Sequence, residues 1–305
     1  MISILKVGIP AADIVWCFDP LRAAHLSFFK KALTIYHPVD QFDNAFIARY
    51  PLRPDIAFSS MKKVRDEMLA RGWPSEFLHH GLAEDFSAMA DLRLKEIQSG
   101  LFRNVVAGNR VKVGFAGNLL GEASDREVMT SIIEENPDCD FHFWGKFKNE
   151  DAYIQLGNHH PEFITFLQCQ SNVVLHGPVT TTVLANGLHQ MNMLWMIWKR
   201  ADHPQWNAHT NPHKVMEYLS TGVPVYTHFM HTYDGLSLLN MASPSATKEE
   251  KVELFALVKK TVMENKEQGI EEMRLRIAFA LEHTYVHLLN EAEVFINKSL
   301  PEKNA

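Results

Sequence analysis

The segment 210–225, with the sequence TNPHKVMEYLSTGVPV, holds the side chains of this chain that are best suited to bind a ligand. Asn211 and Pro212 are residue types that commonly begin a helix. A helix start presents free N–H groups and a partial positive charge, and Lys214 adds a full charge, so this segment can bind phosphate groups. Glu217 lies on the same helix face as Lys214, where its carboxylate can accept hydrogen bonds from ribose hydroxyls. Taken alone, the segment also fits an ordinary surface helix with a Lys–Glu pair.

The residues around this segment predict a parallel sheet that would hold its helix in place. Apolar runs without alternation, separated by helical stretches, are typical of strands that are covered on both faces. Gly222 returns the chain from the helix into the next strand, which puts the helix start at the carboxyl edge of the sheet. In this half of the chain we expect strands at 111–116, 140–144, 172–175, 193–197 and 223–226, and helices at about 124–136, 150–168, 180–190 and 212–221.

The first part of the chain shows the same kind of pattern. We expect a helix at 61–71 and strands at 14–18, 33–36, 56–60 and 76–81. A charged amphipathic helix at 83–99 bridges the two parts, and the last quarter is helical, with a long helix at 271–297. The chain is therefore predicted to be an α/β protein with two parallel sheets.

Length and composition exclude several classes of protein. The 305 residues fit two domains of ordinary size, and 46% apolar with 22% charged residues is typical of a soluble globular chain. A net charge of -6 without a basic stripe argues against nucleic-acid binding. No apolar run is long enough to cross a membrane, and the N-terminus lacks the features of a signal peptide.

The cysteines indicate a reducing compartment. Cys17, Cys139 and Cys169 are an odd number, lie far apart and form no CxxC pair, so we expect reduced thiols. The expected location is the cytoplasm, with peripheral association at the inner membrane surface as the alternative.

The order and spacing of these segments resemble those of family 4 glycosyltransferases, whose fold is called GT-B. Residues 111–118, 141–145, 172–178 and 193–198 are similar to strands and turns of that family's nucleotide-binding domain. The segment 210–225 resembles the family pattern NPxKxxEYLAxGxPV, which this chain matches at Asn211, Pro212, Lys214, Glu217, Tyr218, Gly222 and Pro224. The resemblance implies an α/β fold of two Rossmann-like parallel-sheet domains facing a cleft, with a reduced amino-terminal domain.

The resemblance also implies how the chain divides. We expect an acceptor-side Rossmann-like domain with the bridging helix at 1–108, and a nucleotide-sugar donor-binding Rossmann-like domain at 109–282. A C-terminal helix at 283–305 would pack back on the first domain. Because only about 80 residues precede the bridging helix, the first domain is expected to be reduced or incomplete. An apolar face that a short domain leaves uncovered would favour self-association, so a homo-oligomer is a further expectation.

By the same resemblance, the chain would be a hexosyltransferase of polysaccharide biosynthesis. It would transfer a sugar from a nucleotide-diphosphate sugar to a hydroxyl of a glycan, a lipid carrier or a small acceptor, with retention at the anomeric carbon. Glu217 would hold the donor ribose, and Lys214 with the segment Asn211, Pro212 and His213 would hold the diphosphate. Because positive groups of the chain would stabilise the leaving diphosphate, no metal and no cofactor are expected.

The resemblance assigns three further residues to the donor site. Gly117 and Asn118 follow the first strand of the donor domain and would let the chain approach the donor. Lys146, just after the next strand, is another candidate for phosphate binding. His209 stands eight positions before Glu217, where many family members carry a glutamate near the transferred sugar. The contacts to that sugar and the retaining chemistry therefore stay open.

The candidates for catalytic residues lie in the first domain. Asp40 follows the second expected strand and His80 ends the fourth, so both would lie at the carboxyl edge of that sheet. In a catalytic role, Asp40 would be a carboxylate in the cleft, and His80 would donate a hydrogen bond to the phosphate or sugar of the donor. The alternative is that both are ordinary turn residues. His228 and His231 have no third ligand at a sensible spacing, which argues against a metal site.

Two other functions fit the same sequence. One is a GT-B sugar-nucleotide epimerase, which would need further acid–base carboxylates in the cleft. The other is a degenerate transferase that serves as a nucleotide-sugar-binding or scaffold subunit. The imidazole at His209 and the short first domain favour this second alternative.

Overall fold

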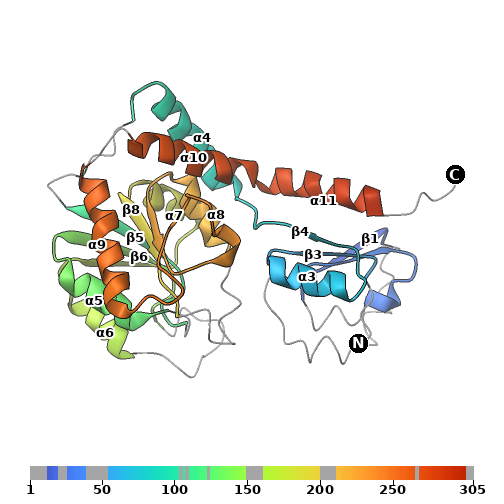
Figure 1. Cartoon of the computed structure of the whole chain (residues 1–305), viewed down its shortest axis with the longest axis horizontal. Helices are drawn as coiled ribbons and strands as arrows, with labels where there is room; N and C mark the ends of the chain where they lie inside the picture. The colour runs from blue at the N-terminus through green and yellow to red at the C-terminus, as the bar shows by residue number, and fades with distance from the viewer. Residues whose placement is uncertain are drawn as a thin grey trace. The chain divides into compact units, whose positions relative to one another are not determined.

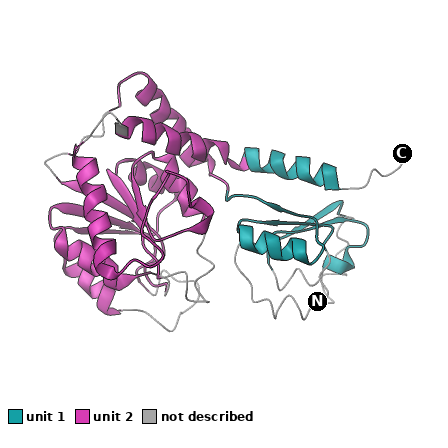
Figure 2. Ribbon diagram, viewed as in Figure 1, with its two compact units in different colours: residues 1–80, 286–305 teal, residues 81–285 magenta. Residues whose placement is uncertain are grey.

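The computed structural model divides the chain into two compact units, residues 1–80 with 286–305 and residues 81–285 (Figure 2). We call them the first and the second unit and describe each by itself. The residues that the structure describes are 12–19, 26–38, 54–102, 106, 110–121, 124–148, 161–199, 211–264 and 268–299.

The first unit is built on a parallel sheet with the strand order β1-β2-β3-β4. Its strands are β1 (Ile14–Cys17), β2 (Leu33–Tyr36), β3 (Ile56–Ser59) and β4 (Ser75–Phe77). The short helix η2 (Leu26–Phe28) and α3 (Lys62–Ala70) pack on one face, and α11 (Tyr285–Ser299) packs on the other (Figure 1). Ala57 faces α3 while Ile56 and Phe58 face Ala292 of α11, as the two-residue period of a strand requires.

The second unit has a six-stranded parallel sheet with the order β7-β6-β5-β8-β9-β10. The strands are β5 (Val111–Ala116), β6 (Cys139–Trp144), β7 (Val173–Gly177), β8 (Met193–Met196), β9 (Val225–Thr227) and β10 (Asn240–Met241). The direction of winding reverses between β5 and β8, which is the doubly wound arrangement of Rossmann-like domains. The strand β10 was not predicted, because a half-buried pair of residues carries no strand pattern.

Helices cover both faces of this second sheet (Figure 1). On one face lie α5 (Arg126–Glu135), α6 (Pro161–Cys169) and α9 (Lys248–Glu264). On the other face lie α4 (Glu84–Gln98), α7 (Thr181–His189), α8 (Lys214–Ser220) and α10 (Gln268–Glu282). The start of the helix expected at 150–168 lies outside the described residues.

The division into units differs from the boundaries expected at 108 and 282. The bridging helix α4 belongs to the second unit, where Phe86, Ala90 and Ile97 join the core formed with α7, α8 and α10. The second unit therefore begins at Gly81, before α4, and ends at Tyr285.

The single long helix predicted at 271–297 is wrong, because the structure interrupts it after Glu282. Thr284 forms a parallel β-bridge with Leu82. The Leu82 amide donates to the His283 carbonyl at 2.8 Å, and the Tyr285 amide donates to the Leu82 carbonyl at 3.4 Å. These backbone groups are thereby withdrawn from the helix ladder and bonded to a segment far away in the sequence, so helical periodicity could not reveal the break.

Candidate functional site

The residues predicted to bind a donor come together at the carboxyl edge of the second sheet. In doubly wound sheets, ligands bind where the winding reverses, outside the carboxyl ends of the strands. Here that point lies between β5 and β8, and Gly117 directly follows β5. The Leu119 amide donates to the Lys146 carbonyl at 2.9 Å, which joins the turn after β5 to the turn after β6. A Cβ added to Gly117 would lie 3.9 Å from Cε of Lys214, so α8 begins beside the same turn.

The two turns touch through glycine backbone. Gly145 has a φ of +126°, and a Cβ added there would lie 1.9 Å from the carbonyl oxygen of Gly117. The Gly117 amide donates to the Trp144 carbonyl at 2.9 Å. Gly117 therefore joins the two turns as well as leaving space near Lys214. From the sequence, Gly145 was expected only as the end of a strand, although a glycine in that position is a signal for such close contact.

Gly145→Ala is expected to lower the free energy of unfolding by about 3 kcal/mol or more, because it combines backbone strain with a backbone clash. Thermal or urea unfolding measures the loss. Gly235→Ala is the matched control: Gly235 also has a positive φ, of 75°, but a Cβ there meets nothing within 4 Å, so about 1 kcal/mol is expected. Equal losses at the two positions would contradict the role given to the Gly145–Gly117 contact.

Asn118 shapes the turn after β5. Its side-chain oxygen accepts from the Leu120 amide at 3.0 Å, and its carbonyl accepts from the Gly121 amide at 3.2 Å. Arg126 of α5 donates to the Leu119 and Gly121 carbonyls and holds the turn from the other side. The Asn118 side chain is exposed, but its oxygen already serves the turn, so Asn118 acts first by positioning the loop.

Two buried tyrosines fix the position of α8. The Tyr218 hydroxyl accepts from the Ala116 amide at 2.7 Å, which ties the middle of α8 to the end of β5. The Tyr233 hydroxyl donates to the side-chain oxygen of Asn211 at 2.7 Å, just before α8 begins. This bond fixes the Asn211 side chain beside the start of the helix, whose backbone the resemblance assigns to the diphosphate. Pro212 and His213 accept the first amide bonds of the helix, from Val215 and Met216.

The positive charge at this edge rests on Lys214 more than on the helix itself. The helix α8 has only seven residues, so the field of its peptide dipoles is small. Lys214 Nζ lies 3.5 Å from Nε2 of His213, and both side chains are at the exposed start of the helix. The full charge of Lys214 is therefore the main electrostatic feature available to a diphosphate.

Glu217 is a buried carboxylate that the described residues do not satisfy. Its side chain is 17% exposed, and within the described part of the chain its Oε2 has no hydrogen-bond partner. Oε1 lies 3.9 Å from Nε2 of His213. Burial raises the pKa of Glu217, and the charge of Lys214 opposes that rise. A buried acceptor without donors costs stability, so its presence one turn after Lys214 points to a ligand that supplies the donors.

Two arginines that were not predicted as site residues, the half-buried Arg93 and the buried Arg276, hold the other end of α8. Arg93 of α4 donates to the Thr221 carbonyl at 2.8 Å and to the His189 carbonyl at the end of α7. Arg276 of α10 donates to the Gly222 carbonyl at 3.1 Å and to the Leu238 carbonyl at 3.0 Å. On their own helices both residues have the sequence context of surface charges, so no local signal marks them.

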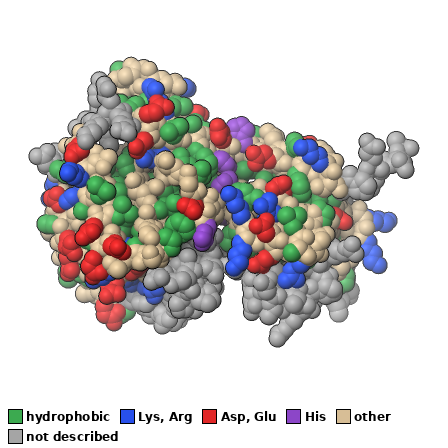
Figure 3. Space-filling model, viewed as in Figure 1, with side chains coloured by type: hydrophobic (Ala, Val, Ile, Leu, Met, Phe, Trp, Pro, Cys, Tyr) green, Lys and Arg blue, Asp and Glu red, His purple; other side chains and the backbone are tan. Residues whose placement is uncertain are grey.

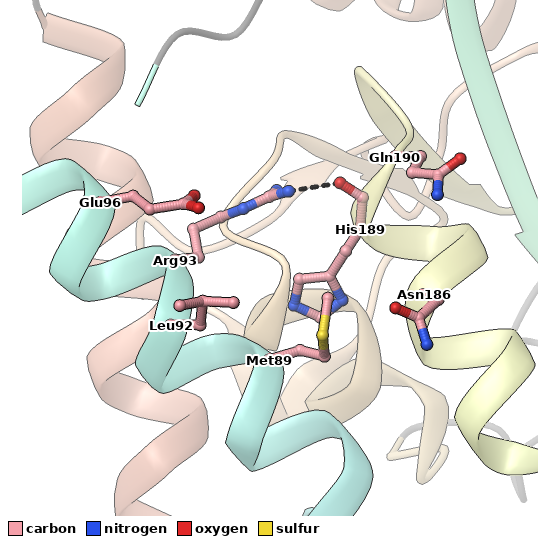
Figure 4. A pocket seen from close by; sticks show the side chains of 7 residues that line it. All are labelled: Met89, Leu92, Arg93, Glu96, Asn186, His189 and Gln190. Carbon is pink, nitrogen blue, oxygen red and sulfur yellow. Dashed lines mark hydrogen bonds between the residues drawn. The ribbon is translucent and has the colours of Figure 1, made fainter. Parts of the chain in front are cut away.

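A small pocket lies beside Arg93, between α4 and α7 (Figure 4). Its volume is about 140 Å³, and its lining includes Glu96, Asn186 and His189. It adjoins the end of α7, just before β8 begins, and therefore lies at the amino edge of the sheet, opposite Lys214 and Glu217. This pocket is therefore separate from the candidate donor site at the carboxyl edge.

Of the two candidates for catalytic residues, the structure describes His80, which lies in the first unit. Asp40 lies outside the described residues, and so does His209. His80 follows β4, and His37 follows β2 at the same carboxyl edge. Burial, with the nearby His80, lowers the pKa of His37 to about 4. The His37 ring packs against Trp16 and Phe58. His37 was not singled out as a site residue from the sequence.

The protein is expected to lose stability as the pH falls from 6.5 towards 4. Burial lowers the pKa of His37 to about 4 and, with Arg93 nearby, that of His189 to about 4. In this window the unfolded chain takes up protons that the folded chain does not, so the free energy of unfolding decreases. Thermal unfolding at pH 7 and pH 5 measures the loss. His37→Phe should reduce this loss of stability, and His287→Phe, at an exposed position, should not. If the loss between pH 7 and pH 5 is unchanged in His37→Phe, protonation of His37 is not its cause.

The described residues form neither a metal centre nor a membrane-spanning helix. Among the described ranges, no three His, Cys, Asp or Glu side chains are grouped to hold a metal ion. No helix in those ranges combines the length and the apolar composition needed to cross a bilayer. On the face that Figure 3 shows, acidic and basic side chains are mixed with apolar ones rather than gathered in a basic stripe.

Solved structures share this fold at low sequence identity. HepE from Anabaena, in complex with UDP-glucose, is 14% identical over 94% of this chain and 79% of that chain, with a TM-score of 0.65. A UDP-forming α,α-trehalose-phosphate synthase from Burkholderia vietnamiensis is 11% identical over 98% and 74%, with a TM-score of 0.66. The apo form of the lipopolysaccharide outer core galactosyltransferase WaaB is 12% identical over 94% and 76%, with a TM-score of 0.61.

These similarities confirm the fold predicted from the sequence, an α/β chain of GT-B type with two parallel sheets. No protein-family model matches the sequence, and no curated protein matches it significantly.

Proposed function

We propose that this chain is a glycosyltransferase of the family 4 type, which transfers a hexose from a nucleotide-diphosphate sugar to a hydroxyl acceptor. The single observation that carries the proposal is the buried carboxylate of Glu217, whose Oε2 has no partner among the described residues, one turn after Lys214 at the winding reversal of the sheet. Lys214 offers a cation for the phosphates, and Glu217, one turn later, offers an acceptor for the ribose hydroxyls. This pair of groups suits a nucleoside diphosphate.

Each residue of the site has a part in this proposal. Lys214 and the backbone at 211–213 bind the diphosphate, and Lys146 adds a second cation at the turn after β6. Charge develops on the leaving diphosphate in the transition state, and these preorganised groups stabilise it without a metal ion or a cofactor. Glu217 orients the donor through its ribose. The reaction proceeds with retention at the anomeric carbon, as the resemblance to family 4 implies.

The acceptor side of the proposal belongs to the first unit. His80 would donate a hydrogen bond to the donor phosphate or sugar, and Asp40 would act as a carboxylate toward the acceptor hydroxyl. We further propose that the acceptor is a glycan, a lipid carrier or a small molecule, and that the reaction belongs to polysaccharide biosynthesis in the cytoplasm.

A uridine nucleotide is the first donor to test, because the similar HepE structures hold UDP or UDP-glucose. UDP, GDP and ADP are compared by the rise in melting temperature that each produces. A ligand at 100 times its Kd stabilises the folded chain by about 2.7 kcal/mol, which such a scan detects. If none of the three, nor their common sugars, raises the melting temperature, the proposed function is wrong.

We expect the chain to bind a nucleotide or nucleotide sugar but to transfer the sugar slowly when it acts alone. The donor residues lie within the second unit, whereas transfer also needs the first unit, whose described sheet has only short strands. Release of free nucleotide and light scattering are measured on the same sample, because a partner or a second copy would complete the acceptor side. Brisk turnover by a strict monomer would contradict this expectation, and release of an epimerised sugar nucleotide would favour the epimerase alternative.

A further inference from the structure

We propose that the amino edge of the first sheet docks on a membrane surface that contains anionic lipids. Two neighbouring aromatic side chains lie at the surface of this edge: Phe28 is 71% exposed and Phe29 is 43% exposed. Lys30 and Lys31 follow directly and are also exposed. Paired phenylalanines beside paired lysines are the combination that interfacial membrane-binding segments use, because the rings enter the headgroup region while the ammonium groups stay at the phosphates.

The topology extends this segment into a surface along the amino edge. The turn 29–32 leads into β2, and the Leu33 amide donates to the Asp13 carbonyl at 2.8 Å, so the start of β1 lies next to it. Ile14, the first residue of β1, is 54% exposed. Leu26 of η2 shares a core cluster with Met68 and Trp73, near the end of α3.

The end of α3 adds a second exposed pair to the same edge. Leu69 is 47% exposed, and Arg71 is exposed two residues later, just before β4. Since β1 and β4 are three strand spacings apart, the edge is about 14 Å wide. Membrane association scales with the apolar area that enters the interface, so several exposed apolar groups on one edge act together.

The charges of this edge favour an anionic surface. Among the described residues of this edge, Lys30, Lys31 and Arg71 stand against Asp13, Asp55 and, in the last turn of α3, Glu67. Asp55 is already engaged, because its carboxylate accepts from the Thr34 amide at 2.8 Å and from the Thr34 hydroxyl at 2.7 Å. The two lysines beside the phenylalanines therefore set the electrostatics of the segment that would enter the interface. This local charge has the opposite sign to the net charge of the whole chain, which is -6.

The same composition argues against a protein partner on this edge. Lysine is depleted in protein–protein interfaces, which bury their apolar centre away from ammonium groups. In a symmetric dimer through this edge, the lysines of one copy would meet those of the other, because a two-fold interface pairs a surface with itself. A lipid surface has neither difficulty, since its phosphates pair with the lysines.

The test is flotation of the 305-residue chain with lipid vesicles. Vesicles of phosphatidylcholine are compared with vesicles in which part of it is replaced by phosphatidylglycerol. We expect the protein to float with the anionic vesicles, and the bound fraction to fall as salt is added. Protein that stays at the bottom with both kinds of vesicle would overturn the proposal.

Two double variants separate the apolar and the charged contributions. Phe28→Ser with Phe29→Ser is expected to weaken vesicle binding at least about tenfold, through the lost apolar area. Lys30→Gln with Lys31→Gln is expected to weaken it about twenty-five-fold, since each lysine near an anionic surface contributes about fivefold. Leu257→Ser is the matched control, because Leu257 is 60% exposed but lies on α9 of the second unit.

The outcomes also distinguish this surface from the proposed donor site. If the vesicles bind to another surface of the protein, the phenylalanine variant floats like the unchanged protein, and the proposal is overturned. If that variant instead dissolves a dimer seen by light scattering while neither protein floats, the edge is a self-association surface, and the proposal is again overturned. Nucleotide affinity should be unchanged in both double variants, so failure of the donor-site proposal would show separately.

Discussion

Glu217→Gln is expected to weaken binding of a nucleoside diphosphate about tenfold to hundredfold, while the ligand-free protein becomes no less stable at neutral pH. A hydrogen bond to a charged group contributes about 1.5–3 kcal/mol, and the ribose hydroxyls lose such bonds when the carboxylate becomes an amide. Titration calorimetry measures the affinity, and thermal unfolding measures the stability of the same variant.

The stability half of this prediction follows from the direction of the pKa shift. Burial raises the pKa of Glu217 above its value of 4.5 in the unfolded chain. The folded chain therefore holds the proton more tightly, and its stability falls as the pH rises through the window from 4.5 up to the folded pKa. At pH 7 the ionised carboxylate is a cost that glutamine removes. A residue kept for ligand binding rather than for folding has this signature.

The matched control is Glu253→Gln, at an exposed position of α9. This change should alter neither affinity nor stability. A folded Glu217→Gln protein with unchanged nucleotide affinity would remove Glu217 from the site. A large loss of stability in Glu217→Gln would instead show that the carboxylate has a structural partner.

Lys214→Ala is expected to weaken binding of the nucleoside diphosphate by about tenfold or more and to leave binding of the nucleoside within about twofold. The reason is that the ammonium group can contact only the phosphates. Calorimetry with uridine and UDP, or with the pair whose base proves to bind, compares the two ligands on one variant. The effect on the diphosphate should shrink as salt is added, because Lys214 lies at the exposed start of α8.

Two controls define what Lys214 supplies. Lys214→Arg keeps the charge and should retain most of the affinity, while Lys248→Ala removes an exposed lysine of α9 and should change nothing. If Lys214→Ala weakens nucleoside and diphosphate alike, Lys214 supports the fold of the site and the phosphates lie elsewhere.

The predicted strands and the placement of α8 followed from patterns that are local in the sequence. The strands β2 and β5 have the bounds expected from their apolar runs, Leu33–Tyr36 and Val111–Ala116. The helix expected at 212–221 is α8, with Lys214 and Glu217 on it. These features were accessible because strand and helix periods, caps and glycine breaks act over a few residues.

The amino-acid sequence by itself therefore determined the α/β class, the two parallel sheets and the helix that carries the proposed donor residues. Only the tertiary structure decided that Oε2 of Glu217 is buried without a partner among the described residues, that Gly145 meets Gly117, and that Arg93 holds the end of α8. It also decided that the last long helix breaks where Thr284 pairs with Leu82. The physical reason is common to all four: burial, backbone contact and hydrogen bonding join residues that are distant in the chain, and such partners leave no periodic trace in the sequence around either residue.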